Sequence, residues 1–388
     1  MKISVEKDYD LTPLRYARGE DAFFRALQQR VDRYFRSNHL TRYATAGMVG
    51  KSMFQLFLWM ALYGLIMSNQ FQGWSLILLQ IGFHFSIFLI SVGIAHDGSH
   101  NAYSRNKRVN QWMTYVFDII GINSYMWDFN HIRSHHNAPN VPLYDSAIYS
   151  FQLFRFHPRA PYLKFHRYQH LYIFVIYALA TLFKLFFLDF FSFLRSRIGF
   201  IKMKKHARKE VLWLFLTKLF VITYTLIMPV VILDAPTWHI VLGFLLGHFI
   251  SGLALGVIFQ VTHISDHSRW PEPDSRGLID NTFARHILET TADFCTRSRL
   301  VTWISGGLNI HVAHHLFPGI CQIHLPQLAR IVRETAYEYE VPYKEYPSVW
   351  AAVASHLTTL KKLGRDRSYH GPGLKAKSNV QALEVTSP

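Results

Sequence analysis

The sequence is poor in cysteine and in charged residues. Only two of its 388 residues are cysteines, Cys295 and Cys321, and they form no Cys-x-x-Cys pair. This excludes a fold built on disulfides and a zinc site built on cysteine. Charged side chains make up 17% of the chain, against about 25% in soluble domains. The low charge favours a membrane protein, and the scarcity of thiols is compatible with a reducing compartment.

The charge that is present is mostly basic. The formal net charge is +16, while 50% of the residues are hydrophobic. A basic excess suits nucleic acid, anionic lipid or an anionic substrate. Nucleic-acid-binding domains are not usually so apolar, so we expect no nucleic-acid partner. The opening segment MKISVEKDYDLTPLRYARGE has no early apolar core, which predicts that it is not a signal peptide.

Long apolar stretches predict a protein that crosses a membrane several times. A spanning helix needs about 20 mainly apolar residues. Four stretches meet this requirement, namely Ser52–Phe71, Trp74–Ala95, Val211–Leu233 and Trp238–Thr262. Among these four, only Val211–Leu233 carries a charge, Lys218. A fifth apolar stretch, Leu171–Leu194, contains Lys184 and Asp189.

The distribution of lysine and arginine predicts the orientation. The segment before the first span is basic, so the positive-inside rule keeps it cytoplasmic. If Leu171–Leu194 crossed the membrane, the segment Arg195–Lys209, with seven Lys or Arg, would lie on the opposite side. We therefore expect Leu171–Leu194 to lie in the membrane interface. This leaves four transmembrane helices, with both termini on the cytoplasmic side.

The N-terminal region contains one amphipathic pattern. Within Asp21–Ser37 the apolar residues Phe23, Leu27, Val31 and Tyr34 recur at helical spacing, with arginines between them. This predicts a helix on the membrane surface, with an ordinary packed helix as the alternative.

The chain therefore divides into three predicted parts. Residues 1–50 form an N-terminal cytoplasmic or interfacial arm, and residues 51–365 form the membrane domain. Residues 366–388 are polar and form a disordered tail. The predicted fold is an all-α integral membrane protein, in which interfacial helices and a cytoplasmic helical cap accompany the four spans.

Histidines form three clusters and one single site beside the predicted spans. They are His96 and His100 in HDGSH, His131, His135 and His136 in HIRSHHNAPN, His311, His314 and His315 in HVAHH, and His263 in FQVTHISD. Helical positions three or four apart share one face, so each cluster can offer at least two imidazoles in one direction. In the four-span topology all of them lie on the same side of the membrane, near the ends of spans.

Eight or nine imidazoles are too many for one ion, since a structural zinc takes four ligands. Two metals with four or five nitrogens each fit the number, and such sites suit iron, copper, zinc or nickel. The absence of H-E-x-x-H removes support for the common zinc protease. A pH switch or chance clustering is the alternative, but converging imidazoles would repel one another once protonated. His84 and His248 lie inside spans, where we expect packing or hydrogen-bonding roles.

The sequence resembles the membrane-bound fatty acid desaturases over roughly residues 50 to 364. The segments that carry the resemblance are HDGSHNAYSRNKRVNQ, SYMWDFNHIRSHHNAPN, FQVTHISD, HILETTADF and GGLNIHVAHHLFP. The ordered trio of histidine boxes, with spans between the second and the third, is the specific feature. The chain looks most like the bacterial acyl-CoA or acyl-lipid branch related to the front-end desaturases.

The resemblance implies a fatty acyl desaturase that uses O2 and a di-iron centre to introduce a C=C bond into an acyl-CoA or acyl-lipid. It implies a separate electron donor, either a ferredoxin or a free cytochrome b5. The implied iron ligands are the eight box histidines, together with His263, which matches an extra histidine of the family. Asp97, Asn137, Asp145 and Asn309 stand beside the boxes and are expected either to orient ligand imidazoles or to cap helices and turns.

Three departures from the family bear on substrate and regiochemistry. Front-end desaturases usually begin the third box with Gln, where this chain has His311. The HPGG haem motif of a fused cytochrome b5 domain is absent, and NAPN follows the second box where relatives often have tyrosine and threonine. A lipid hydroxylase on the same scaffold is the main alternative. Two further alternatives remain. One is a membrane electron carrier with haem bound between His84 and His248, and the other is a non-catalytic protein that binds or transports lipid.

Overall fold

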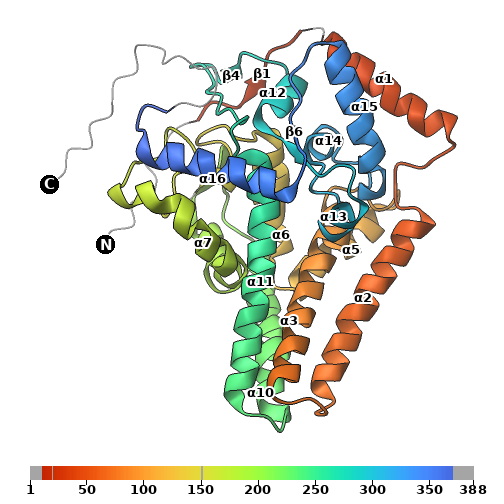
Figure 1. The fold of residues 1–388 in the computed structure, drawn as a ribbon, viewed down its shortest axis with the longest axis vertical. Helices are drawn as coiled ribbons and strands as arrows, with labels where there is room; N and C mark the ends of the chain where they lie inside the picture. The colour runs from red at the N-terminus through yellow and green to blue at the C-terminus, as the bar shows by residue number, and fades with distance from the viewer. Residues whose placement is uncertain (1–10, 20, 150–151, 370–388) are drawn as a thin grey trace.

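The computed structural model describes residues 11–19, 21–149 and 152–369, which are mostly helical (Figure 1). The predicted disordered tail lies almost entirely outside the described residues, as do the first ten residues of the predicted arm. Short strands of two residues each form three pairs, two of them parallel and one antiparallel. The strands are β1 (Arg15–Tyr16) with β4 (Leu278–Ile279), β2 (Arg197–Ile198) with β3 (Ile201–Lys202), and β5 (Asp293–Phe294) with β6 (Glu345–Tyr346).

Five helical segments of the described chain are long and apolar enough to cross a membrane. They are α2 (Ala46–Met67); α3 (Gly73–Ile90) with η1 (Ser91–Ala95) and α4 (His96–Ser99); η5 (Lys164–Tyr168) with α7 (Gln169–Phe183), η6 (Lys184–Leu188) and α8 (Asp189–Leu194); α9 (Arg208–Ile222) with η7 (Thr223–Ile227) and α10 (Met228–Ile232); and α11 (Thr237–His263). The four predicted spans and the predicted interfacial stretch each overlap one of these segments.

Two helical hairpins meet at their tips. The loop between α2 and α3 contacts the loop between α10 and α11, since Gln72 Nε2 donates to the Asp234 carbonyl at 3.2 Å and the Asp234 N–H donates to Asn69 Oδ1 at 2.9 Å. The lower ends of α2, α3, α10 and α11 lie together in Figure 1. The other ends of these two spans, which carry His96 in α4 and His263 in α11, therefore lie on the opposite side of the helical bundle.

Helix α11 stands at the centre of the bundle because glycines let its neighbours approach closely. A Cβ at Gly247 would lie 2.7 Å from His84 Cγ of α3, and a Cβ at Gly256 would lie 2.5 Å from Tyr177 Cγ of α7. Small residues at helix crossings are the usual means of close packing inside membranes. The spacing of glycines along α11 thus fixes α3 and α7 on two of its faces.

The three charges that interrupt the apolar stretches form one buried ion cluster. Lys218 Nζ donates to Asp189 Oδ2 at 2.6 Å and Lys184 Nζ donates to Asp189 Oδ1 at 2.8 Å. Lys218 also donates to the Gly121 carbonyl at 2.7 Å. Because an unpaired charge is costly in apolar surroundings, each of the three charges needs the others as counter-charges. The cluster thereby joins α8 and η6 to α9.

A layer of shorter helices covers the end of the bundle that carries the histidines (Figure 1). It consists of α1 (Ala22–Ser37), α5 (Lys107–Ile119), α6 (Ser124–Trp127), η2 (Asp128–Ser134), η3 (His135–Asn137), η4 (Ser146–Ile148), α12 (Phe283–Thr290), α13 (Arg299–Ile304), α14 (His311–Leu316), η8 (Gln322–His324), α15 (Leu325–Glu338) and α16 (Val349–Arg365).

The apolar face of α1 packs into this layer. Phe23, Leu27, Val31 and Phe35 are buried in one core with residues of α12, α14 and α15, and α1 lies beside α15 in Figure 1. The membrane-surface helix expected for Asp21–Ser37 is therefore wrong, and the packed alternative holds. Amphipathic spacing shows that a helix buries one face, but it does not show what covers that face.

Candidate metal centre

The histidine clusters sit on short, irregular helical segments. The π-helical turn η1 leads directly into His96, and the π-helical turn η2 contains His131. His263 is the last residue of α11, and the third box begins α14 at His311. π-helical turns are rare and concentrate at functional sites, because they rotate side chains out of the regular helical register.

The described structure brings all nine predicted histidines together, eight of them in two adjoining groups and His136 beside these groups. The first group is His96, His100, His131 and His314, and the second is His135, His263, His311 and His315. Within each group, one nitrogen from every ring lies within 4.8 Å of the others. The two groups are adjacent because His135 and His136 are neighbours in sequence, as are His314 and His315.

His136 lies between the groups and belongs by distance to the first. Its Nε2 lies 3.2 Å from Nε2 of His131 and 3.1 Å from Nε2 of His314. Its ring stacks on that of His315, with centroids 4.2 Å apart. Five imidazoles on one side and four on the other match the four or five nitrogens per metal inferred from the sequence.

Hydrogen bonds at Nδ1 turn Nε2 of several rings toward the centre. His135 Nδ1 lies 3.1 Å from both carboxylate oxygens of Asp145, so Nδ1 carries the proton. His311 Nδ1 donates to the Leu308 carbonyl at 3.1 Å. In both rings Nε2 is buried without a hydrogen-bond partner. His263 Nδ1 likewise lies 3.3 Å from the Thr290 carbonyl, while its Nε2 lies 3.2 Å from Nε2 of His315. Unpartnered buried lone pairs of this kind are what a metal ion would satisfy.

The buried rings are held in the neutral form that binds metals. Burial, and after it the charges of neighbouring imidazoles, holds the pKa values of His131, His136 and His314 well below their ordinary value of about 6.5. The same causes act on His311 and His315. Neutral nitrogen donors without a carboxylate suit a borderline transition metal such as iron, zinc or copper, rather than magnesium or calcium.

This burial predicts an acid-sensitive protein once metal is removed. In the unfolded chain the histidines titrate near pH 6.5, whereas in the folded chain the pKa values of His136 and His314 lie well below this. The unfolded state therefore binds more protons as the pH falls below about 6.5, so stability is retained above that pH and lost progressively below it. Thermal unfolding of metal-free protein between pH 8 and 5 measures this. The unfolding temperature should fall less steeply with decreasing pH in His136→Asn than in the natural chain. An equally steep fall would contradict the low pKa of His136.

Asp145 makes the contacts expected for both of its alternatives, since it holds the His135 ring and caps η4. Its carboxylate accepts from His135 Nδ1 and from the backbone N–H groups of Asn140 and Ala147, at 2.9 and 2.8 Å. We expect Asp145→Asn to lower metal content and activity by roughly 10–100-fold, because the amide no longer holds His135 as the Nδ1–H tautomer. Metal analysis and product formation measure the effect. Asp128→Asn, which removes an exposed partner of Arg133, is the control and should change neither.

The other three polar neighbours of the boxes hold backbone and side-chain groups other than the ligand imidazoles. Asn137 Nδ2 donates to the Arg133 carbonyl at 2.9 Å, and Asn309 Nδ2 donates to the Phe294 carbonyl at 3.0 Å. Asp97 accepts from the Gln322 N–H at 3.1 Å and from the Cys321 thiol. These contacts fit the capping alternative.

Asp293 was not predicted, although it lies in the segment HILETTADF. Its Oδ1 accepts from the Val312 N–H at 2.8 Å, at the start of α14, and its Oδ2 accepts from Tyr343 at 2.6 Å. Burial raises the pKa of Asp293 to about 7. The carboxyl group fixes the helix that carries the third box. No spacing or motif around Asp293 in the sequence indicates that it contacts the third box.

Gly306 permits the close approach of the third box to the first. Its φ is +63°, and a Cβ there would lie 2.2 Å from the Val92 carbonyl in η1. A side chain at this position would clash with backbone and strain the residue. The first glycine of GGLNIHVAHHLFP therefore lets the third box lie close to the first.

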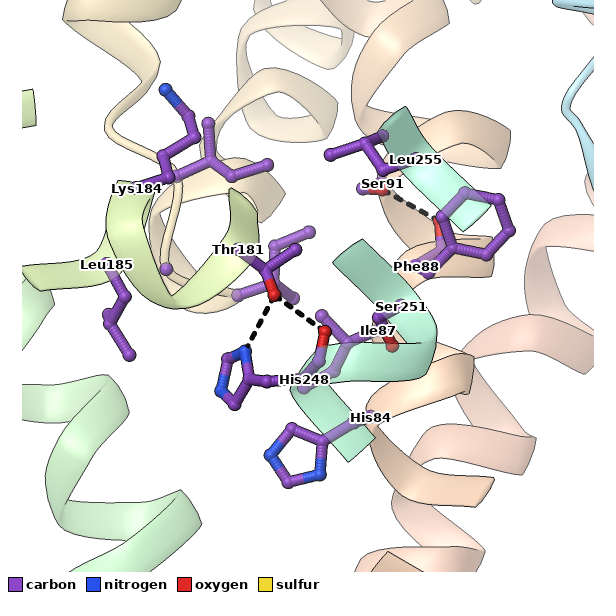
Figure 2. A pocket seen from close by; sticks show the side chains of 13 residues that line it. His84, Ile87, Phe88, Ser91, Thr181, Lys184, Leu185, His248, Ser251 and Leu255 are labelled. Atoms are coloured by element: carbon purple, nitrogen blue, oxygen red, sulfur yellow. Dashed lines mark hydrogen bonds between the residues drawn. The ribbon is translucent and has the colours of Figure 1, made fainter. Parts of the chain in front are cut away.

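His84 and His248 belong to neither group, and Figure 2 shows them at a separate cavity beside Thr181. Their ring centroids are 4.7 Å apart and they border a small cavity of about 40 Å³. His84 Nδ1 lies 2.8 Å from the Gln80 carbonyl, and His248 Nδ1 donates to Thr181 Oγ1 at 3.1 Å. Such closely spaced rings leave no room for a haem between them. The haem-carrier alternative is therefore wrong, and the expected hydrogen-bonding role holds.

The sequence is similar to known fatty acid desaturases. The sequence profile described as fatty acid desaturase matches residues 71–347. An acyl-lipid (8-3)-desaturase of Physcomitrium patens is 32% identical over 360 residues, covering 90% of this chain and 74% of the relative. An sn-1 linoleoyl-lipid 6-desaturase of a Synechocystis species is 30% identical over 363 residues, covering 88% and 96%. A probable Delta(5) fatty acid desaturase of Dictyostelium discoideum is 28% identical over 361 residues, covering 89% and 77%.

Proposed function

The chain belongs to the fatty acid desaturase family, and we propose on that premise that its two histidine groups hold two iron ions. The protein is a multi-pass membrane oxidoreductase of lipid metabolism that desaturates fatty acyl chains. Relatives are named acyl-lipid and linoleoyl-lipid desaturases, so an acyl-lipid is the substrate class we favour over acyl-CoA.

The observation that carries the metal proposal is the donor set. The nine candidate ligands are His96, His100, His131, His135, His136, His263, His311, His314 and His315. All are imidazoles, and Nε2 of His135 and His311 is buried without a partner. Neutral nitrogen donors fit iron, and two bound iron ions would supply the oxidising power that removes hydrogen from an unactivated methylene.

The reaction consumes a reductant as well as O2. Two vicinal C–H bonds break and one C=C bond forms, while O2, two electrons and two protons complete two molecules of water. The electrons come from a separate donor, for which we propose a ferredoxin or a free cytochrome b5. The part played by the chain is to hold the ligands in place, as Asp145 does for His135, and to position one carbon pair of the acyl chain beside them.

We propose four membrane spans, with the termini and the metal centre on the cytoplasmic side. Two observations support four spans over five. The hairpin loops of α2–α3 and α10–α11 contact each other, and α7 runs obliquely beside α11 without reaching the lower end of the bundle (Figure 1). The basic segment Arg195–Lys209 then stays with the other basic segments. Residues 1–50, 51–365 and 366–388 remain our division into arm, membrane domain and tail.

The test is the total fatty acid profile of a host that expresses the chain, with double bonds located by mass spectrometry. A new unsaturated acid supports the proposal and gives the position of the double bond. Purified protein should contain about two iron ions per chain, as the two histidine groups predict. A protein without metal that yields no new acid would contradict the proposal.

A hydroxylase is the second candidate, because the same histidine groups could serve it. If an oxygen atom were transferred to the acyl carbon in place of the second hydrogen removal, the product would be an alcohol. A new hydroxy acid in the same profile would favour this reaction. The names of the relatives favour the desaturase.

A further inference from the structure

An open hollow of about 620 Å³ lies where the end of α1 meets the start of α2. None of the nine histidines lines it, so it is separate from the metal centre. Its wall includes four basic side chains, which are Arg36, His39, Arg42 and Arg105. They come from the end of α1, from the connection to α2 and from the loop after His100.

The charge in the hollow is only partly compensated. Asp32 is the one carboxylate in its wall. It pairs with Arg42 and lies 3.8 Å from Arg36 Nη2. Arg105 lies over the Tyr43 ring, 6.0 Å from its centroid, and has no ion pair among the described residues. Three guanidinium groups thus face a single carboxylate. Arginine is the side chain best suited to bind the oxygens of a phosphate.

The wall is held in place by backbone hydrogen bonds. The Ala44 N–H donates to the Tyr103 carbonyl at 3.0 Å, which joins the α1–α2 connection to the loop that carries Arg105. The Cys321 N–H donates to the Arg42 carbonyl at 2.9 Å. These bonds hold the backbone that carries Arg42 and the loop that carries Arg105, so the backbone of the site needs no rearrangement, which lowers the cost of binding.

The helix that follows the hollow along the chain has exposed apolar side chains. Helix α2 begins at Ala46, and Val49, Met53 and Phe57 on it are 45%, 63% and 64% exposed. Since α2 is a candidate span, this face meets lipid chains. A basic hollow above an apolar, lipid-facing helix matches the two halves of a phospholipid.

We propose that this hollow binds the phosphate group of an anionic membrane phospholipid whose acyl chains lie along α2. The positive-inside rule explains why this face is basic, but it does not explain why three arginines surround one hollow. Lys107 and Arg108 are exposed and equally basic, and neither lines the hollow. They provide a matched control for general surface charge.

The experiment measures binding of phosphatidylglycerol to the purified full chain in detergent by native mass spectrometry, with phosphatidylcholine as the comparison lipid. The double variant Arg36→Gln with Arg105→Gln should bind phosphatidylglycerol roughly tenfold or more weakly. Lys107→Gln with Arg108→Gln should bind it as the natural chain does. Arg36→Lys with Arg105→Lys keeps the charge and should retain most of the binding, which shows that these positions tolerate substitution.

Two outcomes would overturn the proposal. Equal weakening by both pairs of glutamine variants, or none by either, would mean that the hollow is not a specific site. A lipid-free protein that binds inorganic phosphate as tightly as it binds phosphatidylglycerol would assign the hollow to a soluble phosphate instead. Because lipid binding is the readout, failure here leaves the proposed desaturase function untouched.

Discussion

Replacing His135 with alanine is expected to abolish the unsaturated product while the chain still accumulates in the membrane. His135 offers an unpartnered Nε2 to the second histidine group and is oriented by Asp145. Alanine removes the ligand itself, so the loss should exceed the roughly 10–100-fold expected when a supporting residue is changed. The measurement is the fatty acid profile of the expressing host, together with the amount of protein in its membranes and the iron content after purification.

His170→Ala is the matched control for this experiment. His170 lies on α7, outside both histidine groups, so its loss should leave the product and the iron content unchanged. Full activity in His135→Ala would remove His135 from the ligand set. Loss of the protein from the membrane would instead mean that the variant fails to fold, and His135→Gln, which keeps a polar side chain of similar size, would then separate folding from metal binding.

Replacing Asp189 with asparagine is expected to destabilise the membrane domain strongly. Asp189 is buried between Lys184 and Lys218, at 2.8 and 2.6 Å. Its loss leaves two ammonium groups without a counter-charge in apolar surroundings. Removing one partner of a buried ion pair typically costs about 3–5 kcal/mol. Thermal unfolding of the purified protein in detergent should show a large fall in the transition temperature.

A second substitution tests whether the ion cluster is the cause. Asp189→Asn combined with Lys218→Met removes the anion and the more deeply buried cation together, so part of the lost stability should return. Glu272→Gln, which breaks the exposed pair with Arg159, should change stability by no more than about 1 kcal/mol. If Glu272→Gln and Asp189→Asn had the same small effect, the buried cluster would not be holding the helices together.

Several features could be predicted from the sequence because they depend on residues close together in the chain. Runs of apolar residues identify helices such as α2 and α3, since the length of an apolar helix is set by the bilayer. The spacing of His131, His135 and His136 indicates a common face, because helical geometry fixes it. Lysine and arginine counts suggested which ends of the spans lie together, and all nine histidines do lie together in two groups.

Other features depend on contacts between residues that are distant in the chain. In the sequence, three separate charges interrupt the apolar stretches, namely Lys184, Asp189 and Lys218. Only the packing of α8 and η6 on α9 brings them into contact. The amphipathic pattern of α1 predicts a helix with one buried face, but it does not specify whether lipid or protein covers that face.

The sequence by itself predicted a multi-span membrane protein with a histidine-rich metal site, because hydrophobic length and the spacing of imidazoles are local properties of the chain. The desaturase class followed from the resemblance of the ordered histidine boxes to that family. Only the tertiary structure decided how His136 and the eight other histidines divide between two groups, and which Nδ1 atoms are held by Asp145 and by backbone carbonyls. It also decided that three arginines surround one hollow beside α2. The physical reason is that distances across the fold are set by side-chain packing, as at Gly306 and Gly247, and packing is not encoded at any single position.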